Sequence, residues 1–333
     1  LKTLRKQSDE INLILIFANA RYMKSQRQLR AKIQSVKNIN QITKAMEMVA
    51  AAKMRKAEKA LFSARPFAKH LFEIMRKLIK QEEVWQNYIP SLAKSSASPE
   101  APVCFLVVAS DRGLAGSFNN VILRFTMAEV ENVKQQGKQV EVAAVGRKAR
   151  DFFSARGVKV AAEFFRYSDA VTIYDAAPVA DWLLQEFEKG RFEKVMVSYT
   201  EFVSALVSRP ALFQLLPFKT SELAKIAQRI ILKKAAAPEP EKEISYLDYV
   251  LEPSRKELLE ELSRYLVKVA VTRFLFESNT AEHSSRMITM KNATDNAGRI
   301  KEELTLELNK ARQSAITQEV SEVSSSKEAL TYE

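Results

Sequence analysis

The side chains that most often do chemistry are few in this sequence and stand far apart. The 333 residues contain two histidines, His70 and His283, and one cysteine, Cys104. A zinc site needs three or four closely spaced ligands, and nucleophilic catalysis needs a base beside the nucleophile. Neither chemistry has a candidate set here. Cys104 lies in the apolar run 103–108, where a buried core thiol is expected.

One turn could bind a phosphate group. Residues 111–117 (DRGLAGS) follow an apolar run of strand length and precede a helical pattern, which is where anion-binding turns occur. However, the turn lacks the G-x-G-x-x-G spacing, and none of the seven glycines lies in a GxxxxGK[ST] phosphate loop. We interpret it as a tight strand-to-helix connection. The sequence thus predicts no catalytic residue, no cofactor-binding residue and no metal ligand.

The elements that would position any functional residue are dominated by helices, because seven glycines in 333 residues leave little room for tight turns. From Met23 onward, apolar or small residues recur about every 3.5 residues, the period of a left-handed coiled coil. We predict a helix over 23–90, interrupted at Pro66. Its seam would contain Leu29, Ile33, Val36, Ile39, Ile42, Met46, Val49, Ala52 or Lys53, Ala57 and Ala60.

A second long helix is predicted over 254–323, with Ser254 as its N-cap and residues 324–333 as a frayed tail. At 1.5 Å per residue it would be roughly 100 Å long, too long for a compact globule of this size. It therefore needs a partner helix along its length. Its seam again has a spacing near 3.5 residues and contains Met287, Met290, Thr294, Ala297, Lys301, Leu304, Leu308, Ala311 and Ala315.

Residues 103–218 alternate between strand and helix patterns and predict an α/β domain with a mostly parallel sheet. The strands are expected at 103–109, 140–145 and 194–200, followed by a hairpin pair within 207–218. The helices are expected at 117–136, 148–156 and 175–189. A linker is predicted at 235–253. The fold class is thus a long antiparallel coiled coil of the N- and C-terminal helices, with an inserted Rossmann-like α/β domain.

The first 22 residues are ambiguous. An apolar run at 11–17 follows basic residues, but Asp9 and Glu10 interrupt the basic flank. We expect the mature chain to begin near Met23, with 1–22 as an extension outside the fold. No apolar run in the sequence reaches the 18 or so residues that a membrane-spanning helix needs.

The charge distribution indicates an acidic partner. The net charge is +12, and residues 21–80 contain sixteen Lys and Arg residues against three acids. Such a segment suits nucleic acid, anionic lipid or an acidic protein surface. A coiled-coil nucleic-acid-binding protein is therefore one alternative, although no aromatic residue lies between Arg30 and Leu61 for base stacking. A small α/β enzyme with helical arms is another; it predicts nucleotide turnover by the isolated chain.

Three segments carry a specific resemblance. Residues 29–55 (LRAKIQSVKNINQITKAMEMVAAAKMR), residues 111–119 (DRGLAGSFN) and the region 282–319, with EHSSRMITMKNATDNA and NKARQSAITQE, resemble the signatures of the gamma subunit of F-type ATP synthases. The resemblance covers about residues 25–323. The sequence lacks the cysteine-bearing insertion of chloroplast members, and its tail after Ser324 is less apolar than is usual in the family.

The resemblance implies a rotor rather than an enzyme. It implies a central stalk subunit without a catalytic site or cofactor, which couples transmembrane proton flow to ATP synthesis by rotating inside the alpha-beta hexamer. The implied partners are the alpha, beta and epsilon subunits and the membrane c-ring, at the cytoplasmic face of a bacterial inner membrane; neither nucleic acid nor a small-molecule substrate is implied. Met46 matches the position that faces the acidic lever loop of beta. The positions that match contacts with the catch loop of beta are Arg312, Gln313, Thr317 and Glu319.

Overall fold

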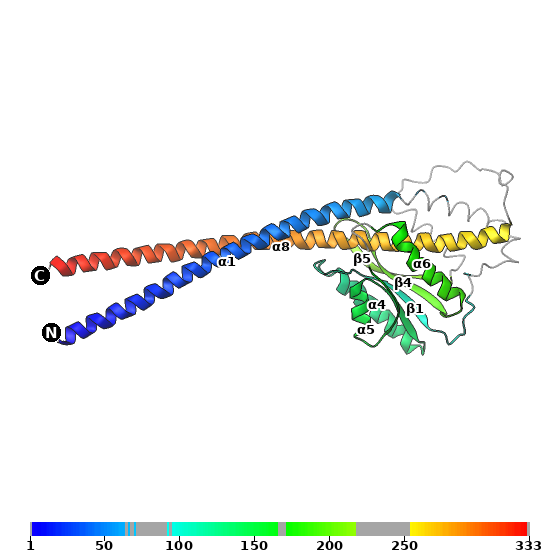
Figure 1. The fold of residues 1–333 in the computed structure, drawn as a ribbon, viewed down its shortest axis with the longest axis horizontal. Helices are drawn as coiled ribbons and strands as arrows, with labels where there is room; N and C mark the ends of the chain where they lie inside the picture. Colours follow the sequence, from blue (N-terminus) through cyan, green and yellow to red (C-terminus); the bar gives the residue numbers. More distant parts are fainter. Residues whose placement is uncertain are drawn as a thin grey trace. The chain divides into compact units, whose positions relative to one another are not determined.

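The computed structural model describes residues 2–63, 66, 70, 92, 95–165, 171–217 and 254–331. The chain forms two compact units, one from Leu1–Met48 with Met290–Glu333 and the other from Val49–Thr289. Helices α1 (Lys2–Ser63) and α8 (Arg255–Thr331) contribute residues to both units (Figure 1). None of the helices in the described part of the chain is both long and apolar enough to span a bilayer.

The first unit is an antiparallel pair of helices, as predicted. The Gln26 side chain donates a hydrogen bond to the carbonyl of Ala311 (3.3 Å), and Asn40 donates to the carbonyl of Thr294 (2.8 Å). Residue numbers therefore rise along α1 as they fall along α8, which is the direction that a coiled coil of the two chain ends requires. The predicted seam of α8 is confirmed in this unit, except that Lys301 is exposed.

The predicted seam of α1 is only half right. Leu29, Ile33 and Val36 are half-buried, but Ile39 and Ile42 are 49% and 59% exposed. The less exposed positions continue instead at 40, 43, 47 and 50, which is the strict 3-4-3-4 spacing of a coiled coil. The apolar residues shift by one position after Val36, so their stripe turns away from α8 and polar residues take the seam.

The second unit contains a five-stranded sheet in the order β3-β2-β1-β4-β5. Strands β1 (Val103–Val108), β2 (Val140–Val145), β3 (Lys159–Phe164) and β4 (Lys194–Phe202) are parallel, and β5 (Ser208–Leu216) is antiparallel to β4. Strand β3 was not among the predicted strands. The predicted hairpin pair within 207–218 is wrong, because that segment is one strand whose partner is β4.

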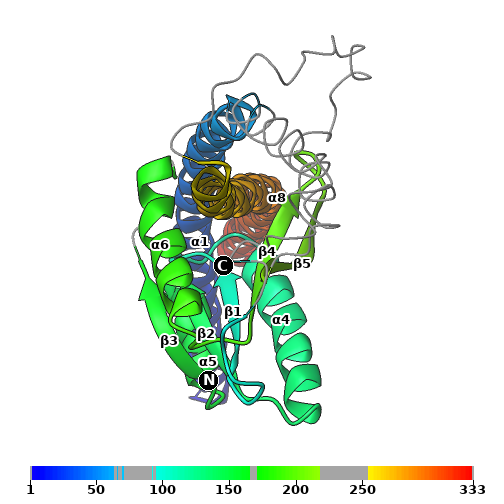
Figure 2. The same cartoon turned by 90° about the vertical axis from the view of Figure 1, so that its right-hand side faces the viewer.

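Helices cover both faces of this sheet, and alternate strand residues point to each (Figure 2). Val103, Phe105 and Val107 pack with α4 (Phe118–Gln135) and α5 (Arg147–Ser154). Cys104, Leu106 and Val108 share the other cluster, with α6 (Ile173–Glu188) and the buried residues of α8 from Leu266 to Ala281. This part of α8 therefore belongs to the core of the second unit, although the same helix continues into the coiled coil.

The helix ends differ from the sequence-based bounds. Helix α1 begins at Lys2 rather than near Met23, and α8 continues to Thr331, eight residues beyond the predicted end at residue 323. Apart from Pro66 and His70, the predicted continuation of the first helix between 64 and 90 lies outside the described residues, as does the predicted linker 235–253.

Candidate functional site

The predicted partner-contact residues all lie in the coiled-coil unit, but in two separate places. Met46 is half-buried on α1, at the level of α8 residues near Thr294. Arg312, Gln313, Thr317 and Glu319 are exposed on α8. Eighteen or more residues of α8 separate Thr294 from this group, which is about 27 Å of helix. The structure thus brings the four α8 residues together and leaves Met46 apart from them.

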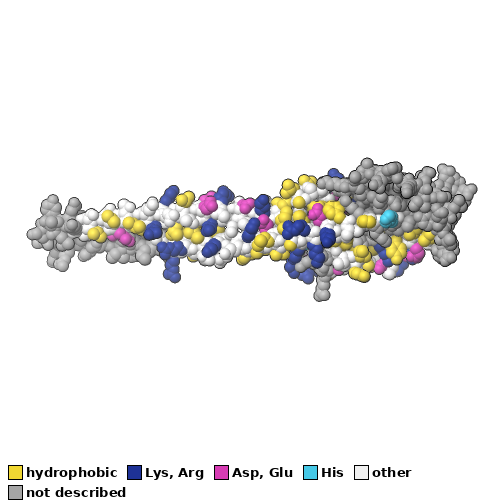
Figure 3. Space-filling model, turned by 90° about the horizontal axis from the view of Figure 1, so that it is seen from above, with side chains coloured by type: hydrophobic (Ala, Val, Ile, Leu, Met, Phe, Trp, Pro, Cys, Tyr) yellow, Lys and Arg dark blue, Asp and Glu magenta, His cyan; other side chains and the backbone are white. Residues whose placement is uncertain are grey.

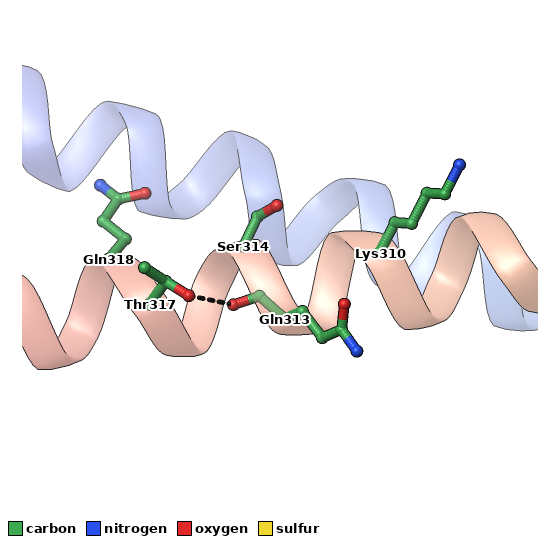
Figure 4. A pocket seen from close by; sticks show the side chains of 5 residues that line it. All are labelled: Lys310, Gln313, Ser314, Thr317 and Gln318. Atoms are coloured by element: carbon green, nitrogen blue, oxygen red, sulfur yellow. Dashed lines mark hydrogen bonds between the residues drawn. The ribbon is translucent and has the colours of Figure 1, made fainter.

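Two residues of the α8 group line a shallow open hollow, whereas Arg312 and Glu319 do not. Gln313 and Thr317 border it together with Lys310, Ser314 and Gln318 (Figure 4). The Thr317 hydroxyl donates to the main-chain carbonyl of Gln313 (3.0 Å), one turn earlier in the same helix. The Thr317 side chain is therefore partly satisfied by its own helix, whereas the side-chain amide of Gln313 is directed away from that bond. Hydrogen-bonding side chains on one exposed face suit contact with another polypeptide better than enclosure of a small molecule.

The surroundings of Met46 are charged and amphipathic. The neighbouring Glu47 forms an ion pair with Lys44 (3.1 Å), and both lie on α1. Exposed cations recur along this part of the helix, at Arg27, Arg30, Lys32 and Lys37, and Figure 3 shows Lys and Arg side chains along the visible face of the coiled coil. Beside them stand the exposed apolar residues of the displaced stripe, Ile39 and Ile42.

Sequence reasoning missed a polar trio in the coiled-coil seam. The Thr294 hydroxyl donates to the Thr43 hydroxyl (2.9 Å), and Asn40 donates to the Thr294 carbonyl (2.8 Å). A methyl group added at Gly298 would lie 3.9 Å from the Asn40 amide, so the two helices approach closely here. Strict counting in sevens from Leu29 would have found Thr43, and from Ile33 it would have found Asn40, but their polarity made the neighbouring Ile39 and Ile42 look like the better seam.

The turn 110–119, between β1 and α4, meets α8 directly. The Ser285 hydroxyl donates to the carbonyl of Ala115 (2.7 Å), and the Arg286 guanidinium lies 3.4 Å from the carbonyl of Gly113. Gly116 has a φ of +54°, and a Cβ there would lie 2.6 Å from the Thr289 hydroxyl. The sequence-based interpretation as a tight connection is correct, but the turn also serves as a contact surface for the helix.

Helix α8 occupies the edge of the sheet where many α/β proteins bind ligands. In open α/β sheets, ligands bind outside the carboxyl ends of the strands, where the strand order reverses. Here that place lies between β1 and β4, because α4, which follows β1, and α6, which precedes β4, cover opposite faces. The main-chain N–H of Thr200, in β4, donates to the Ser278 hydroxyl (3.0 Å), and the Ser284 hydroxyl donates to the carbonyl of Ala205. Two main-chain groups at the end of β4 that could bind a ligand are therefore hydrogen-bonded to side chains of α8.

The charged groups at this edge form one cluster. Arg286 pairs with Glu282 (2.6 Å) and lies 3.3 Å from the His283 ring. Burial raises the pKa of Glu282 above its ordinary value, Asp111 adds to the shift, and Arg286 and Lys53 oppose it. Within the described residues, no group of three or more His, Cys, Asp or Glu side chains has the placement of a metal site. These charged groups thus connect the turn 110–119 with α8.

The comparisons with known proteins agree with this geometry. The ATP synthase family model matches residues 25–330. The ATP synthase gamma chain of Chloroflexus aurantiacus is 36% identical over 309 residues, which cover 93% of this chain and 100% of that relative. The gamma chain of Legionella pneumophila is 32% identical over 302 residues, covering 90% and 98%.

Solved structures share the fold. A chain of the Euglena gracilis mitochondrial ATP synthase, in a structure of OSCP, F1 and the c-ring, has a TM-score of 0.58 at 18% identity and covers 92% of this chain and 94% of that one. A chain of the Tetrahymena thermophila mitochondrial ATP synthase central stalk and c-ring has a TM-score of 0.52 at 24% identity, covering 76% and 99%. With an antiparallel pair of terminal helices in one unit and a five-stranded sheet in the other, and with relatives matched over nearly their full length, the chain belongs to the ATP synthase gamma chain family.

Proposed function

We propose that this chain is the central rotor shaft of an F-type ATP synthase, and that it couples proton flow to ATP chemistry without a catalytic site of its own. The observation that carries the proposal is the antiparallel pairing of the two chain ends, in a chain matched over residues 25–330 to the family. A paired helical shaft resists bending and twisting better than either helix alone. The relatives from Chloroflexus aurantiacus and Legionella pneumophila are gamma chains and give no support to nucleic-acid binding.

Contacts at the carboxyl ends of the strands support a non-catalytic role. In this chain, Ser278, Ser284 and Ser285 hydrogen-bond to the strand ends and loops where a nucleotide would otherwise be held. ATP would therefore be bound and hydrolysed by the partner chains, alpha and beta. The isolated chain should show no nucleotide turnover.

The partner contacts are proposed on the coiled coil. Met46 and the exposed cations of α1 would meet the acidic lever loop of beta, because such cations attract an acidic loop at long range with little need for an exact fit. Arg312, Gln313, Thr317 and Glu319 would contact the catch loop of beta, since all four are exposed on α8. The epsilon subunit and the c-ring would bind elsewhere on the chain, with the complex peripheral to the cytoplasmic face of a bacterial inner membrane.

Co-expression with the alpha and beta chains tests the proposal. One copy of this chain should purify with each hexamer of three alpha and three beta chains, and sustained ATP hydrolysis should depend on its presence. The control is the same alpha and beta preparation without this chain. A hexamer that hydrolyses ATP equally well without the chain, or a chain that elutes alone as a self-paired dimer, would overturn the proposal.

A further inference from the structure

The segment DRGLAGSFN (residues 111–119) has no task in the function proposed above, yet most of its residues have a defined contact. Asp111 accepts a hydrogen bond from the main-chain N–H of Arg147, at the start of α5 (3.0 Å). Asn119 accepts from the main-chain N–H of Ser110 (3.0 Å) and donates to the Ser110 hydroxyl (2.8 Å). Phe118 is buried in the core. These contacts fix the turn 110–119 to the α/β body.

The rest of the turn faces α8. The carbonyl of Ala115 accepts from Ser285, and Gly116 lies so close to Thr289 that no side chain fits between them. Ser285 and Thr289 are one helical turn apart and therefore lie on the same face of α8. Ala115 is 2% exposed, so its contact with Ser285 is shielded from water. The turn thus recognises one particular face of the helix.

Directional contacts restrict a helix in a way that apolar packing does not. Residues 270–281 of α8 are buried throughout, and the apolar members of this stretch pack in the core cluster shared with β1 and α6. Such packing resists separation, but hydrogen bonds additionally require that particular atoms face each other. Ser278 and Ser284 supply two such bonds at the end of β4, and Ser285 supplies one at the end of β1. A rotation of α8 about its own axis would break all three.

We propose that the turn 110–119 sets the rotational position of α8 on the α/β body, and that torque passes between the body and the shaft at this contact. The proposal rests on the rotor function. Ser285 and Thr289 act as positioning residues, because they touch neither nucleotide nor the partner chains in this account. The turn and the partner-contact residues act on the same element, because α8 is one continuous helix from Arg255 to Thr331.

The test compares two serines of the same helix in the assembled complex. Ser285→Ala removes the donor to the Ala115 carbonyl. Ser263→Ala is the matched control, because the Ser263 hydroxyl is buried and donates to the carbonyl of Leu259 in its own helix (2.6 Å) rather than to the turn. A probe on the α/β body of each complex, with the hexamer immobilised, reports the angular spread of the body while the rotor waits for ATP. Protons pumped per ATP are measured in vesicles, and melting temperatures are measured for each isolated chain.

Ser285→Ala should widen the angular spread and lower the number of protons pumped per ATP, with a melting temperature close to that of Ser263→Ala. Gly116→Ala should widen the spread further, because its backbone conformation and the Thr289 contact both disfavour a side chain. Equal angular spreads in Ser285→Ala and Ser263→Ala would overturn the proposal. So would a spread that widens only in proportion to a lower melting temperature. Failure of the wild-type chain to rotate at all would instead count against the rotor function.

Discussion

Cys104 illustrates how burial determines the chemistry of a single residue. Its side chain is completely buried on β1, in the cluster shared with α6 and α8. Burial raises the pKa of the thiol, and the nearby Glu141 carboxylate adds to the shift. The thiolate is the reactive form of cysteine, so the folded protein contains almost none of it at neutral pH.

We therefore expect Cys104 to resist iodoacetamide at about pH 8 in the folded chain, and to react at the rate of a free cysteine after unfolding in guanidinium. Mass spectrometry of the alkylated chain measures both rates. Rapid alkylation under native conditions would mean that β1 opens to solvent, contrary to the core described here.

Glu282 gives the corresponding prediction for a carboxyl group. Burial raises its folded-state pKa above the ordinary value of 4.5. The folded chain then holds this proton more tightly than the unfolded chain, so the stability contributed by Glu282 is greatest below that value. It falls as the pH rises through the raised pKa and is constant above it.

Glu282→Gln removes this titration, so its free energy of unfolding relative to wild type should rise as the pH increases through that interval. Urea unfolding between about pH 4 and pH 8 measures the difference. Glu302→Gln serves as the control, because Glu302 is an exposed residue of the same helix. Parallel pH profiles for wild type and Glu282→Gln would show that the Glu282 carboxyl is not desolvated.

At the scale of elements, the sequence predicts α8 better than α1. Apart from Lys301, the α8 seam combines apolar and small residues at coiled-coil spacing, and the structure confirms it. On α1, the seam positions after Val36 are no longer the apolar ones. Asn40 and Thr43 hydrogen-bond to Thr294 there, whereas Ile39 and Ile42 are exposed. Apolar spacing alone does not reveal such a change, since it ignores hydrogen bonds made across the seam.

The other elements show the same limit. Strand β3 was missed because it lies at the edge of the sheet, is only partly buried and contains Ala161, Ala162 and Glu163, which are poor strand formers. The α8 residues that hold the turn 110–119 were missed because they are polar residues within a helix, where solvent exposure is the usual expectation. The sequence did locate the turn itself, from its position after a strand and before a helix.

Asn40→Ala tests the polar part of the seam. Loss of the bond to the Thr294 carbonyl should lower the stability of the helix pair by about 1 kcal/mol, because a partly buried acceptor loses its donor. Gln34→Ala is the control, since Gln34 is exposed and bonds only to Asn38 on the same helix. Urea unfolding followed by helix content measures both. Equal losses for the two variants would indicate that the seam bond contributes nothing specific.

At the scale of the whole molecule, the main feature is that two uninterrupted helices contribute residues to both units. Helix α8 runs without interruption from the core of the α/β unit into the coiled coil, and α1 has residues in both units as well. The segments that carry the family resemblance lie on both of these helices and on the turn that meets α8. Which atoms meet across those segments became visible only in the structure, since such contacts join residues more than 150 positions apart.

Met46→Lys tests the proposed contact with the lever loop at this scale. The added cation beside an acidic loop would strengthen the attraction by about 1–4 kcal/mol, depending on the local dielectric, and hold the rotor too tightly. Assembly should be retained while proton pumping per ATP falls. Met48→Lys is the control, because it adds the same charge at an exposed position two residues away. Unchanged pumping in Met46→Lys, or an equal loss in both variants, would show that the assigned contact is wrong.

The central claim is that this chain turns as a shaft while its partners hydrolyse ATP. The most direct measurement immobilises the hexamer, attaches a visible probe to the α/β body of this chain and records the probe during hydrolysis. We predict sustained rotation in one direction, at a rate that follows the ATP concentration and stops when the ATP is exhausted. Steady hydrolysis beneath a probe that only fluctuates about one angle would contradict the account.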